Sequence, residues 1–344
     1  MNAMTEKRHN ILVVGAGSIG ERHLRCFQAT GRCQLAFCEP NDKRRAEVSR
    51  RLGIKAAFSS LERARSQGEF SAAVVATPAP SHIPLALELA EGNCHVLLEK
   101  PVSLTLDRVA ELAKLVKSAD LVCAVGYMHR AHSGNRALKA AIESGKLGEL
   151  RQIRIQQSQP LAVLRPAYHE VYFASHKQGG GALHDFMTHL YNLGEHLAGP
   201  IERVFTDAAH QGLDGVEVED TVHSLTRQGD VMGAYTCNLT QQANEFVVTV
   251  VGDRGMGRVD YVNQRWSLLT EPLGEWQHHR VDIPDWDCVY RAQNEAFLDA
   301  IEGTGAVFCD LESGIQTLGV NLASAESWKA GEWKTTTQIT KASK

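Results

Sequence analysis

Short apolar runs alternate with amphipathic stretches over the first third of the chain. The apolar runs are continuous, as in strands buried on both faces of a sheet, and they predict strands at 11–14, 34–38, 72–76, 95–98 and 121–125. The stretches between them predict helices at 19–29, 43–52, 84–90 and 106–118. Strands and helices that alternate in this way predict a parallel, doubly wound α/β sheet with right-handed crossovers.

The pattern changes after about residue 130. A helix at 136–143 leads into a long extended run at 149–159, and further strands are predicted at 201–209, 221–227, 231–239, 246–251 and 258–262. Most of these strands follow one another without helices, which indicates a large, mostly antiparallel open sheet. Three more helices are predicted, at 182–197, 292–301 and 313–328. We therefore expect a doubly wound domain over 1–130 and an α+β domain over 131–344.

Composition and charge narrow the class of protein. The 344 residues are 43% hydrophobic and 22% charged, and 36 Lys and Arg against 40 Asp and Glu give a net charge of -4. This balance argues against a nucleic-acid or membrane partner, and no apolar run approaches the roughly 20 residues of a membrane-spanning helix. The polar start of the chain has no signal-peptide core, so a cytoplasmic protein is expected.

The eight cysteines are scattered and form no C-x-x-C pair. Several lie inside apolar runs, which is typical of buried, reduced thiols rather than of a disulfide framework or a zinc site. No bound metal is expected.

A glycine-rich segment, Gly15-Ala16-Gly17-Ser18-Ile19-Gly20, directly follows the first predicted strand and opens the first helix. An ordinary glycine-rich turn is the alternative interpretation of such a string. In this context Gly15 permits a tight turn, Gly17 permits a pyrophosphate to approach the backbone, and Gly20 permits close packing of helix on strand. The phosphates would lie at the helix N-terminus, beside Ser18 and Ile19.

Glu39 ends the second predicted strand, nineteen positions beyond Gly20. A carboxylate there is placed to bind the ribose hydroxyls of a dinucleotide and would repel the additional phosphate of NADP, so NAD is favoured. Lys43, Arg44 and Arg45 follow closely and would partly reverse this preference if they faced the cofactor. Their alternative interpretation is a solvated first turn of the next helix.

Lys100 follows a predicted strand of the parallel sheet, within Glu99-Lys100-Pro101. Ligands of such sheets bind beyond the carboxyl ends of the strands, which makes Lys100 a candidate site residue rather than an ordinary loop lysine.

Asp185 and His189 lie four residues apart on a predicted helix that follows Gly179, Gly180 and Gly181. Residues at this spacing share one helix face, and a carboxylate beside an imidazole suits a general base near neutral pH. A solvent-exposed pair is the alternative. A metal site with His184 is weaker because adjacent helical residues point about 100° apart.

Taken together, these segments resemble the Gfo/Idh/MocA family, which contains glucose–fructose oxidoreductase and myo-inositol dehydrogenase. The resemblance runs in order along nearly the whole chain. It rests on the Gly15 to Gly20 segment, Ala76-Thr77-Pro78 with His82, Glu99-Lys100-Pro101, Gly126-Tyr127-Met128-His129-Arg130, the Gly179 to His189 segment and Asn294-Glu295-Ala296-Phe297-Leu298. It implies an N-terminal Rossmann domain that binds NAD(P), and a C-terminal domain for substrate binding and for assembly into homodimers or homotetramers.

The resemblance also implies roles for single residues. Lys100, Asp185 and His189 match the family's catalytic residues, with His189 as the general acid/base. The cofactor cleft would be lined by Thr77, Pro78, His82 and Glu99, with Lys100 near the nicotinamide. Tyr127 and Arg130 would border the substrate. The chain departs from the family at His184, His129 and Asn192, and it has an aromatic, histidine-rich segment from Tyr168 to Lys177. We expect Tyr168 and His184 to contribute to the substrate pocket.

The function implied is reversible, NAD-dependent oxidation of a secondary alcohol on a sugar, a polyol or a related small molecule. His189 would take the hydroxyl proton, Lys100 would stabilise the developing alkoxide, and Asp185 would bind a neighbouring hydroxyl or orient His189. Two alternatives use the same fold: an NAD-dependent glycoside hydrolase that acts by transient oxidation, and a non-catalytic NAD-binding regulatory protein.

Overall fold

A computed structural model describes residues 9–336. Apart from residues 9 and 10, the polar start of the chain, on which the expected absence of a signal peptide rests, lies outside the described residues. The chain forms two compact units. The first contains the chain up to Met128 together with Pro284–Glu312, and the second contains His129–Ile283 together with the chain from Ser313 onward.

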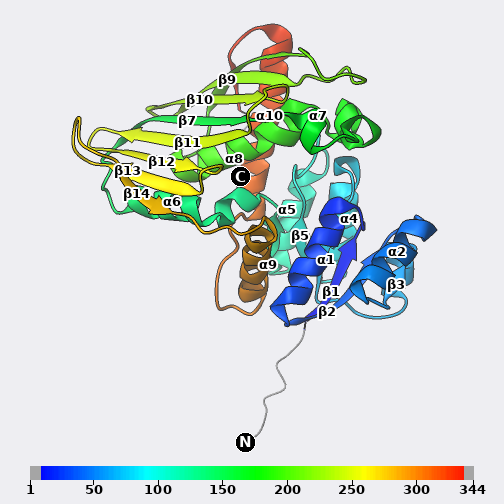
Figure 1. Cartoon of the computed structure of the whole chain (residues 1–344). Helices are drawn as coiled ribbons and strands as arrows, with labels where there is room; N and C mark the ends of the chain where they lie inside the picture. Colours follow the sequence, from blue (N-terminus) through cyan, green and yellow to red (C-terminus); the bar gives the residue numbers. More distant parts are fainter. Residues whose placement is uncertain (1–8, 337–344) are drawn as a thin grey trace, which may run out of the picture. The chain divides into compact units, whose positions relative to one another are not determined.

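The first unit is built on a six-stranded sheet with the order β3-β2-β1-β4-β5-β6, and all of its strand pairs are parallel (Figure 1). The chain leaves β1 in one direction to reach β2 and leaves β4 in the other direction to reach β5, so right-handed crossovers place their helices on opposite faces. The strands are β1 (His9–Val14), β2 (Cys33–Cys38), β3 (Ala57–Phe58), β4 (Ala72–Val75), β5 (His95–Leu98) and β6 (Cys123–Val125).

Helices cover both faces of this sheet, and the predicted doubly wound fold is confirmed. The helices are α1 (Ser18–Thr30), α2 (Asp42–Leu52), α3 (Leu61–Arg65), α4 (His82–Glu91) and α5 (Val109–Ser118), with a 3-10 turn, η1, at Ala79–Ser81. Strand side chains such as Ile11, Val13 and Val74 are fully buried against them. The sequence missed β3 and α3 because two and five residues are too short to show a period.

The chain returns to the first unit after residue 283, whereas all residues from 131 onward were expected to form the second domain. The helix α9 (Asp287–Ile301) packs against α1. Its Phe297 and Leu298 are buried in the core of the sheet. Its acidic side chains also meet basic ones of the first unit, through the pairs Arg22–Asp287, Arg25–Asp287, Arg32–Asp299, Arg32–Glu302 and His9–Glu302, at 2.8–3.0 Å.

The second unit is built on a nine-stranded sheet with the order β14-β13-β12-β11-β7-β10-β9-β8-β15. Only β7 and β10 pair in parallel, so the expected open, mostly antiparallel sheet is confirmed. The strands are β7 (Leu150–Ser158), β8 (Arg203–Ala209), β9 (Thr221–Gln228), β10 (Val231–Asn238), β11 (Glu245–Gly252), β12 (Met256–Asp260), β13 (Arg265–Leu269), β14 (Gln277–Arg280) and β15 (Lys334–Thr335).

The sequence did not predict β13, β14 or β15. All four residues of β14 are exposed and polar or charged, so this edge strand has no buried face to give an alternating pattern.

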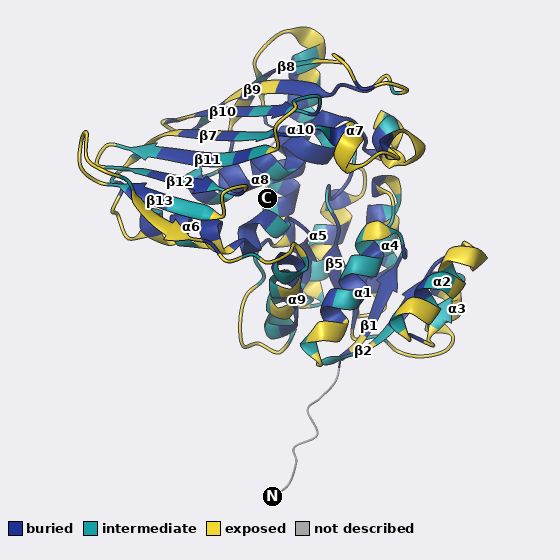
Figure 2. Ribbon diagram, in the orientation of Figure 1, coloured by how far each residue is buried: buried dark blue, intermediate teal, exposed yellow. Residues whose placement is uncertain are grey.

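One face of the nine-stranded sheet is covered by helices. The helix α8 packs on β7 and β10, and α6 packs on β12 and β13. Figure 2 shows buried residues along the central strands. The inward side chains of these strands, such as Ile153, Val248 and Val250, are fully buried. The helices are α6 (Ser133–Glu143), α7 (Leu161–Leu164), α8 (Thr188–Ala198) and α10 (Leu311–Ala330), with 3-10 turns η2 (Met128–Ala131), η3 (Tyr168–Glu170), η4 (Tyr172–Ala174) and η5 (His176–Gln178).

Two further expectations are answered by the described part of the chain. All eight cysteines are unpaired, as the scattered spacing predicted. Within residues 9–336, every helix is too short or too polar to cross a bilayer.

Candidate functional site

The glycine-rich loop between β1 and α1 has the shape that a dinucleotide requires. Gly15 has a φ of +92°, and a Cβ at this position would lie 2.7 Å from the carbonyl oxygen of Ala76. A Cβ on Gly20 would lie 1.9 Å from the carbonyl oxygen of Gly15, whereas a Cβ on Gly17 would meet nothing within 4 Å. Gly15 and Gly20 therefore close the turn, and Gly17 leaves open space at the N-terminus of α1, where no side chain caps the helix.

Glu39 lies at the end of β2 with its carboxylate buried beside this loop. One oxygen accepts the backbone N–H of Ala16 at 3.2 Å, and the other accepts that of Asn41 at 3.0 Å. Arg44 approaches the carboxylate at 3.5 Å, and the Arg45 guanidinium donates to the Glu39 carbonyl at 2.8 Å. Glu39, the predicted ribose-binding acid, therefore also holds the glycine-rich loop in place. Of the three basic residues that follow, Arg44 and Arg45 contact Glu39.

His82 joins the loops that follow β4 and β5. Its ring nitrogens lie 2.8 Å from the carbonyl oxygens of Thr77 and Pro101. The ring is 1% exposed, and burial lowers the pKa of His82. Pro78 lies between Thr77 and η1, and the Ser81 hydroxyl donates to that of Thr77 at 2.7 Å. The assignment of these residues to the cofactor cleft stays a prediction, and the contacts show what holds their loop.

Glu99 and Lys100 follow β5 directly. The Glu99 carboxylate is buried, and its two oxygens meet the His23 ring at 2.8 Å and the backbone N–H of Lys100 at 3.2 Å. The Lys100 side chain is half-buried. Tyr127, after β6, is 1% exposed. The predicted substrate and cofactor contacts of these residues stay predictions.

Asp185 and His189 lie on a helix that begins with a π-helical turn, Leu183–Met187, and continues as α8. A π-turn is wider than the α-helical turn assumed from the sequence, so the two residues are not spaced as in a regular α-helix. The turn begins after Gly181, which has a φ of +85°. Single π-turns inside helices are frequent at functional sites.

Glu219 fixes the start of this π-turn. Its carbonyl oxygen accepts the N–H of Ala182 at 2.9 Å, and its buried carboxylate accepts the N–H of Leu183 at 2.7 Å. The second carboxylate oxygen meets the ring of His176. This contact raises the pKa of His176, while burial lowers the pKa of the neighbouring His184. Sequence reasoning missed Glu219 because nothing in its surroundings marks it as a cap.

Asp185 is 5% exposed and is approached from the segment between β7 and the π-turn (residues 159–182), which we call the connecting strap. The hydroxyl of Tyr172 donates to one carboxylate oxygen at 2.8 Å, and the guanidinium of Arg165 lies 3.8 Å from the other. Arg165 also lies over the ring of Phe186. The sequence marked the aromatic segment that contains Tyr172 as a candidate wall of the substrate pocket, but it assigned Tyr172 no separate role and did not mark Arg165.

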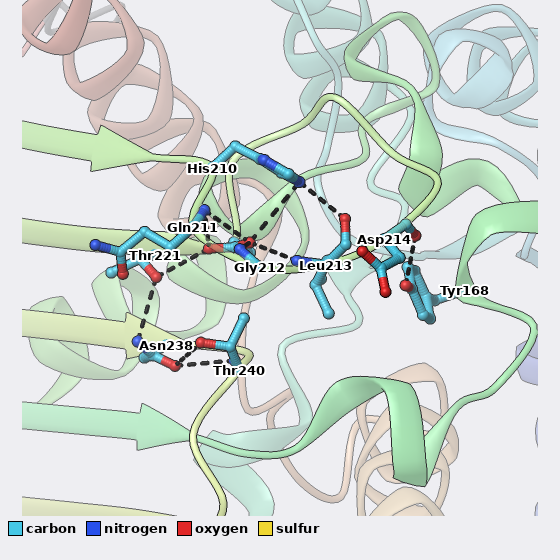
Figure 3. A network of polar contacts seen from close by, with 10 residues as sticks. Tyr168, His210, Gln211, Gly212, Leu213, Asp214, Thr221, Asn238 and Thr240 are labelled. Atoms are coloured by element: carbon cyan, nitrogen blue, oxygen red, sulfur yellow. Dashed lines mark hydrogen bonds and ion pairs between the residues drawn. The ribbon is translucent and has the colours of Figure 1, made fainter.

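The connecting strap is anchored at a second point by Tyr168. The Tyr168 hydroxyl donates to the carbonyl oxygen of Asp214 at 2.6 Å (Figure 3). The loop that carries Asp214 is itself held by the buried carboxylate of Asp220, which accepts the N–H groups of Gln211, Gly212 and Leu213 at 2.8–3.0 Å. The hydroxyl of Tyr168 therefore serves this anchor, and its predicted contact with the substrate stays a prediction.

His189 lies against a cluster of aromatic rings. The centroid of its ring lies 5.0 Å from the ring centroid of His129, and the two rings are nearly perpendicular. His129 in turn contacts Phe246 and Tyr261, which are stacked on each other. His132 stacks on the other side of Tyr261, and burial lowers the pKa of His132 to about 4. His129 is one of the positions at which the sequence departs from the family that it resembles, and its ring packs against one side of the His189 ring.

A buried chain of hydrogen bonds runs from Arg130 to Glu195. The Arg130 guanidinium donates to Asn192 at 2.7 Å, Asn192 donates to Thr317 at 2.9 Å, and the Thr317 hydroxyl donates to Glu195 at 2.6 Å. Burial raises the pKa of Glu195 to about 7. The side-chain oxygen of Asn192, another position at which the sequence departs from the family that it resembles, thus accepts the hydrogen bond from Arg130. The predicted contact between Arg130 and the substrate stays a prediction.

Within residues 9–336, no group of three or more His, Cys, Asp and Glu side chains is arranged to hold a metal ion.

The sequence matches known families over both units. Residues 9–127 match the model of the Gfo/Idh/MocA oxidoreductases described as an NAD-binding Rossmann fold, and residues 135–258 match the model of the C-terminal domain of the same group. The chain belongs to the Gfo/Idh/MocA family. The resemblance stated from the sequence is confirmed, and the first unit of this Gfo/Idh/MocA protein is an NAD-binding Rossmann domain.

Named relatives lie at low identity. Myo-inositol 2-dehydrogenase from Thermotoga maritima is 26% identical over 271 residues, which are 76% of this chain and 78% of that protein. The 1,5-anhydro-D-fructose reductase of Ensifer adhaerens is 25% identical over 93% of this chain and 96% of its own. Among solved structures, levoglucosan dehydrogenase in complex with NADH and levoglucosan superposes with a TM-score of 0.87 at 19% identity, covering 96% of this chain and all of that one. This superposition shows that the Gfo/Idh/MocA fold is shared.

The contact between Tyr172 and Asp185 predicts a role for Tyr172 in turnover. Tyr172→Phe removes a hydrogen bond to a buried carboxylate, which is typically worth about 1.5–3 kcal/mol, so kcat/KM should fall about tenfold or more. Steady-state kinetics would measure this. Tyr191→Phe, which removes a buried hydroxyl that contacts Ser224 and Ser324, is the control and should lower stability without changing kcat/KM. Unchanged kinetics in Tyr172→Phe would contradict the role.

The raised pKa of Glu195 predicts a pH-dependent stability. An acid whose pKa is higher in the folded than in the unfolded chain stabilises the fold while it is protonated, and this stabilisation is lost as the pH rises from about 4.5 through 7. The shift corresponds to a loss of about 3 kcal/mol. Glu195→Gln should remove this loss, as measured by urea unfolding at pH 5 and pH 8. The exposed Glu143→Gln should not, and parallel profiles for wild type and Glu195→Gln would refute the assignment.

Proposed function

We propose that this protein is an NAD-dependent oxidoreductase that transfers a hydride between the nicotinamide and a secondary alcohol or ketone of a sugar, a polyol or a related small molecule. The observation that carries the proposal is the helix with Asp185 and His189, in a chain that belongs to an NAD-binding oxidoreductase family. On this helix a buried carboxylate is held by Tyr172 and Arg165.

The chain's own residues supply binding, orientation and proton transfer. NAD, when bound, supplies the hydride acceptor. The open N-terminus of α1 beside Gly17 fits its pyrophosphate. His189, with one side of its ring fixed by His129, takes the proton of the substrate hydroxyl. Asp185 accepts a hydrogen bond from a neighbouring hydroxyl, because Tyr172 and Arg165 hold its carboxylate in one orientation. Lys100 stabilises the negative charge that develops on the oxygen.

NAD is proposed over NADP because of Glu39. A buried carboxylate at this position can accept hydrogen bonds from ribose hydroxyls but disfavours a phosphate beside it. Arg44 and Arg45 would counter this repulsion, but both already contact Glu39, through its carboxylate and its carbonyl oxygen. Levoglucosan dehydrogenase, which shares the fold, was solved with NADH.

The proposed substrate class follows from the hydrogen-bonding groups and from the relatives. Asp185, Tyr172 and Arg165 form a dense set of donors and acceptors. Such a set suits a ligand with several hydroxyl groups, because each hydroxyl both donates and accepts. The similar proteins are named for myo-inositol, 1,5-anhydro-D-fructose and levoglucosan, which are polyhydroxylated rings.

A parallel screen tests the function. Sugars, inositols and sugar acids are added with NAD or NADP, and ligand binding is followed by thermal shift and reduction by absorbance at 340 nm. At least one polyhydroxylated compound should raise the melting temperature and reduce NAD faster than NADP. Cleavage of a glycoside without net NADH formation would instead indicate the hydrolase alternative, and a protein that is inactive on every class would contradict an enzymatic role.

Two variants test the assigned roles on the substrate found in this screen. Lys100→Met and His189→Ala should each lower kcat by at least about a hundredfold, because each removes a group that acts on the reacting oxygen. Both should keep their affinity for NADH, measured by fluorescence titration. Near-normal turnover in both variants would refute the mechanism.

A cytoplasmic homodimer or homotetramer is proposed from two features. The outer face of the nine-stranded sheet exposes Leu225 and Met232 by about half, at 52% and 50%, on the adjacent strands β9 and β10. Exposed apolar side chains on neighbouring strands can contribute to a contact between chains. The eight unpaired cysteines are typical of a reducing compartment. Light scattering should give the mass of two or four chains, and a single-chain mass would exclude the assembly.

A further inference from the structure

A buried histidine lies between the glycine-rich helix and the strand end that carries Lys100. His23 is on the second turn of α1, and its side chain is 0% exposed. Its Nε2 lies 2.8 Å from a carboxylate oxygen of Glu99, and its Nδ1 lies 3.1 Å from the side-chain oxygen of Asn294 on α9. One ring thus connects three segments of the first unit that are far apart in the sequence.

Both nitrogens of the His23 ring face oxygen acceptors. One ring nitrogen is thus held by the carboxylate of Glu99 and the other by the side-chain amide of Asn294, and the ring is buried on all sides. The amide of Asn294 is 0% exposed and holds the ring from the side opposite Glu99.

The backbone on the other side of Glu99 leaves its carboxylate little freedom. A Cβ on Gly126 would lie 2.7–3.0 Å from the three carboxyl atoms of Glu99. The N–H of Gly126 donates to the carbonyl oxygen of Leu98 at 2.8 Å, which holds this glycine next to β5. The Glu99 carboxylate is therefore confined between the His23 ring and the Gly126 backbone.

The confined carboxylate determines the path of the chain at the next residue. The Glu99 oxygen that does not face His23 accepts the backbone N–H of Lys100 at 3.2 Å. A shift of the carboxylate would move this N–H and with it the Cα atom from which the Lys100 side chain extends. A displacement of about 1 Å at a reacting group can cost about a hundredfold in rate.

We propose that His23 is a positioning residue for Lys100 and acts through Glu99, which it holds against Gly126. The inference rests on the proposed function, in which Lys100 acts on the reacting oxygen. The helix α1 would then have two roles, because its N-terminus binds the cofactor phosphates and its His23 positions Lys100. This role of His23 also explains why α9 returns to this unit, because Asn294 completes the set of contacts around His23.

The first unit contains a second histidine–glutamate pair that serves as a matched control. His9 is 8% exposed, and its Nε2 lies 2.8 Å from Glu302, the residue that caps α9. His9 begins β1, so this pair ties the same helix to the same sheet at the amino end of the strands. His9→Gln should therefore cost stability without affecting Lys100.

The experiment compares His23→Gln, Gly126→Ala and His9→Gln with the wild type. Gly126 does not have a positive φ, so an alanine there is compatible with the backbone, and the three atoms nearest to its Cβ would all be carboxyl atoms of Glu99. Lysines are dimethylated with ¹³C-formaldehyde, and the Lys100 resonance is assigned by its loss in Lys100→Arg. The kcat on the substrate found in the screen and the affinity for NADH are measured in parallel.

We expect the Lys100 resonance to move in His23→Gln and in Gly126→Ala and to stay unchanged in His9→Gln. The first two variants should lose about 10–100-fold in kcat while their affinity for NADH changes less than about twofold. An unchanged Lys100 resonance with normal kcat in folded His23→Gln overturns the proposal. If His23→Gln does not fold, Gly126→Ala decides by the same two readouts.

The two proposals can fail separately. Normal turnover in Lys100→Met would show that Lys100 is not needed for the reaction, while the resonance would still report whether His23 positions it. Loss of turnover in Lys100→Met with normal kcat and an unmoved resonance in the folded Gly126→Ala and His23→Gln variants would overturn the role of His23 alone.

Discussion

Buried carboxylates that accept backbone N–H groups shape the loops of both units. A carboxylate removed from water has to be satisfied by donors, and the backbone has to bend so that its N–H groups point at it. The carboxylate of Glu39 accepts the backbone N–H of Ala16, and that of Glu99 accepts the backbone N–H of Lys100. In the second unit the carboxylate of Glu219 accepts the backbone N–H of Leu183 at the start of the π-turn. These interactions fix the three segments whose conformation matters most for the proposed chemistry.

The parallel sheet could be predicted because strands that are buried on both faces consist of consecutive apolar residues. The glycine-rich loop could be predicted as well, since only glycine tolerates the φ of Gly15 and the approach of its Cα to Ala76. Candidate residues such as Lys100 and His189 came from short motifs whose order along the chain is specific. These signals are local, and each can be read within a few residues.

The features that the sequence did not show depend on distant partners. The contact between His23 and Glu99 spans 76 positions, and Glu219 caps a turn that begins 36 positions before it. The π-turn at Leu183–Met187 follows from that cap and from Gly181, so the helical period alone suggested an ordinary α-helix. The sequence also could not show that the hydroxyl of Tyr172 contacts Asp185 while that of Tyr168 donates to the distant carbonyl oxygen of Asp214.

The return of α9 has a consequence for how the protein is made. The strands and helices up to Met128 leave the ribosome first, but the returning segment with Asn294, Phe297 and Leu298 begins only after roughly 155 intervening residues, His129–Ile283. At a synthesis rate of about 5–20 residues per second, the nascent Rossmann sheet waits about 10–30 s for its last helix. During this interval α1 lacks the helix that packs against it in the finished protein, so apolar surface that α9 later buries stays exposed to solvent.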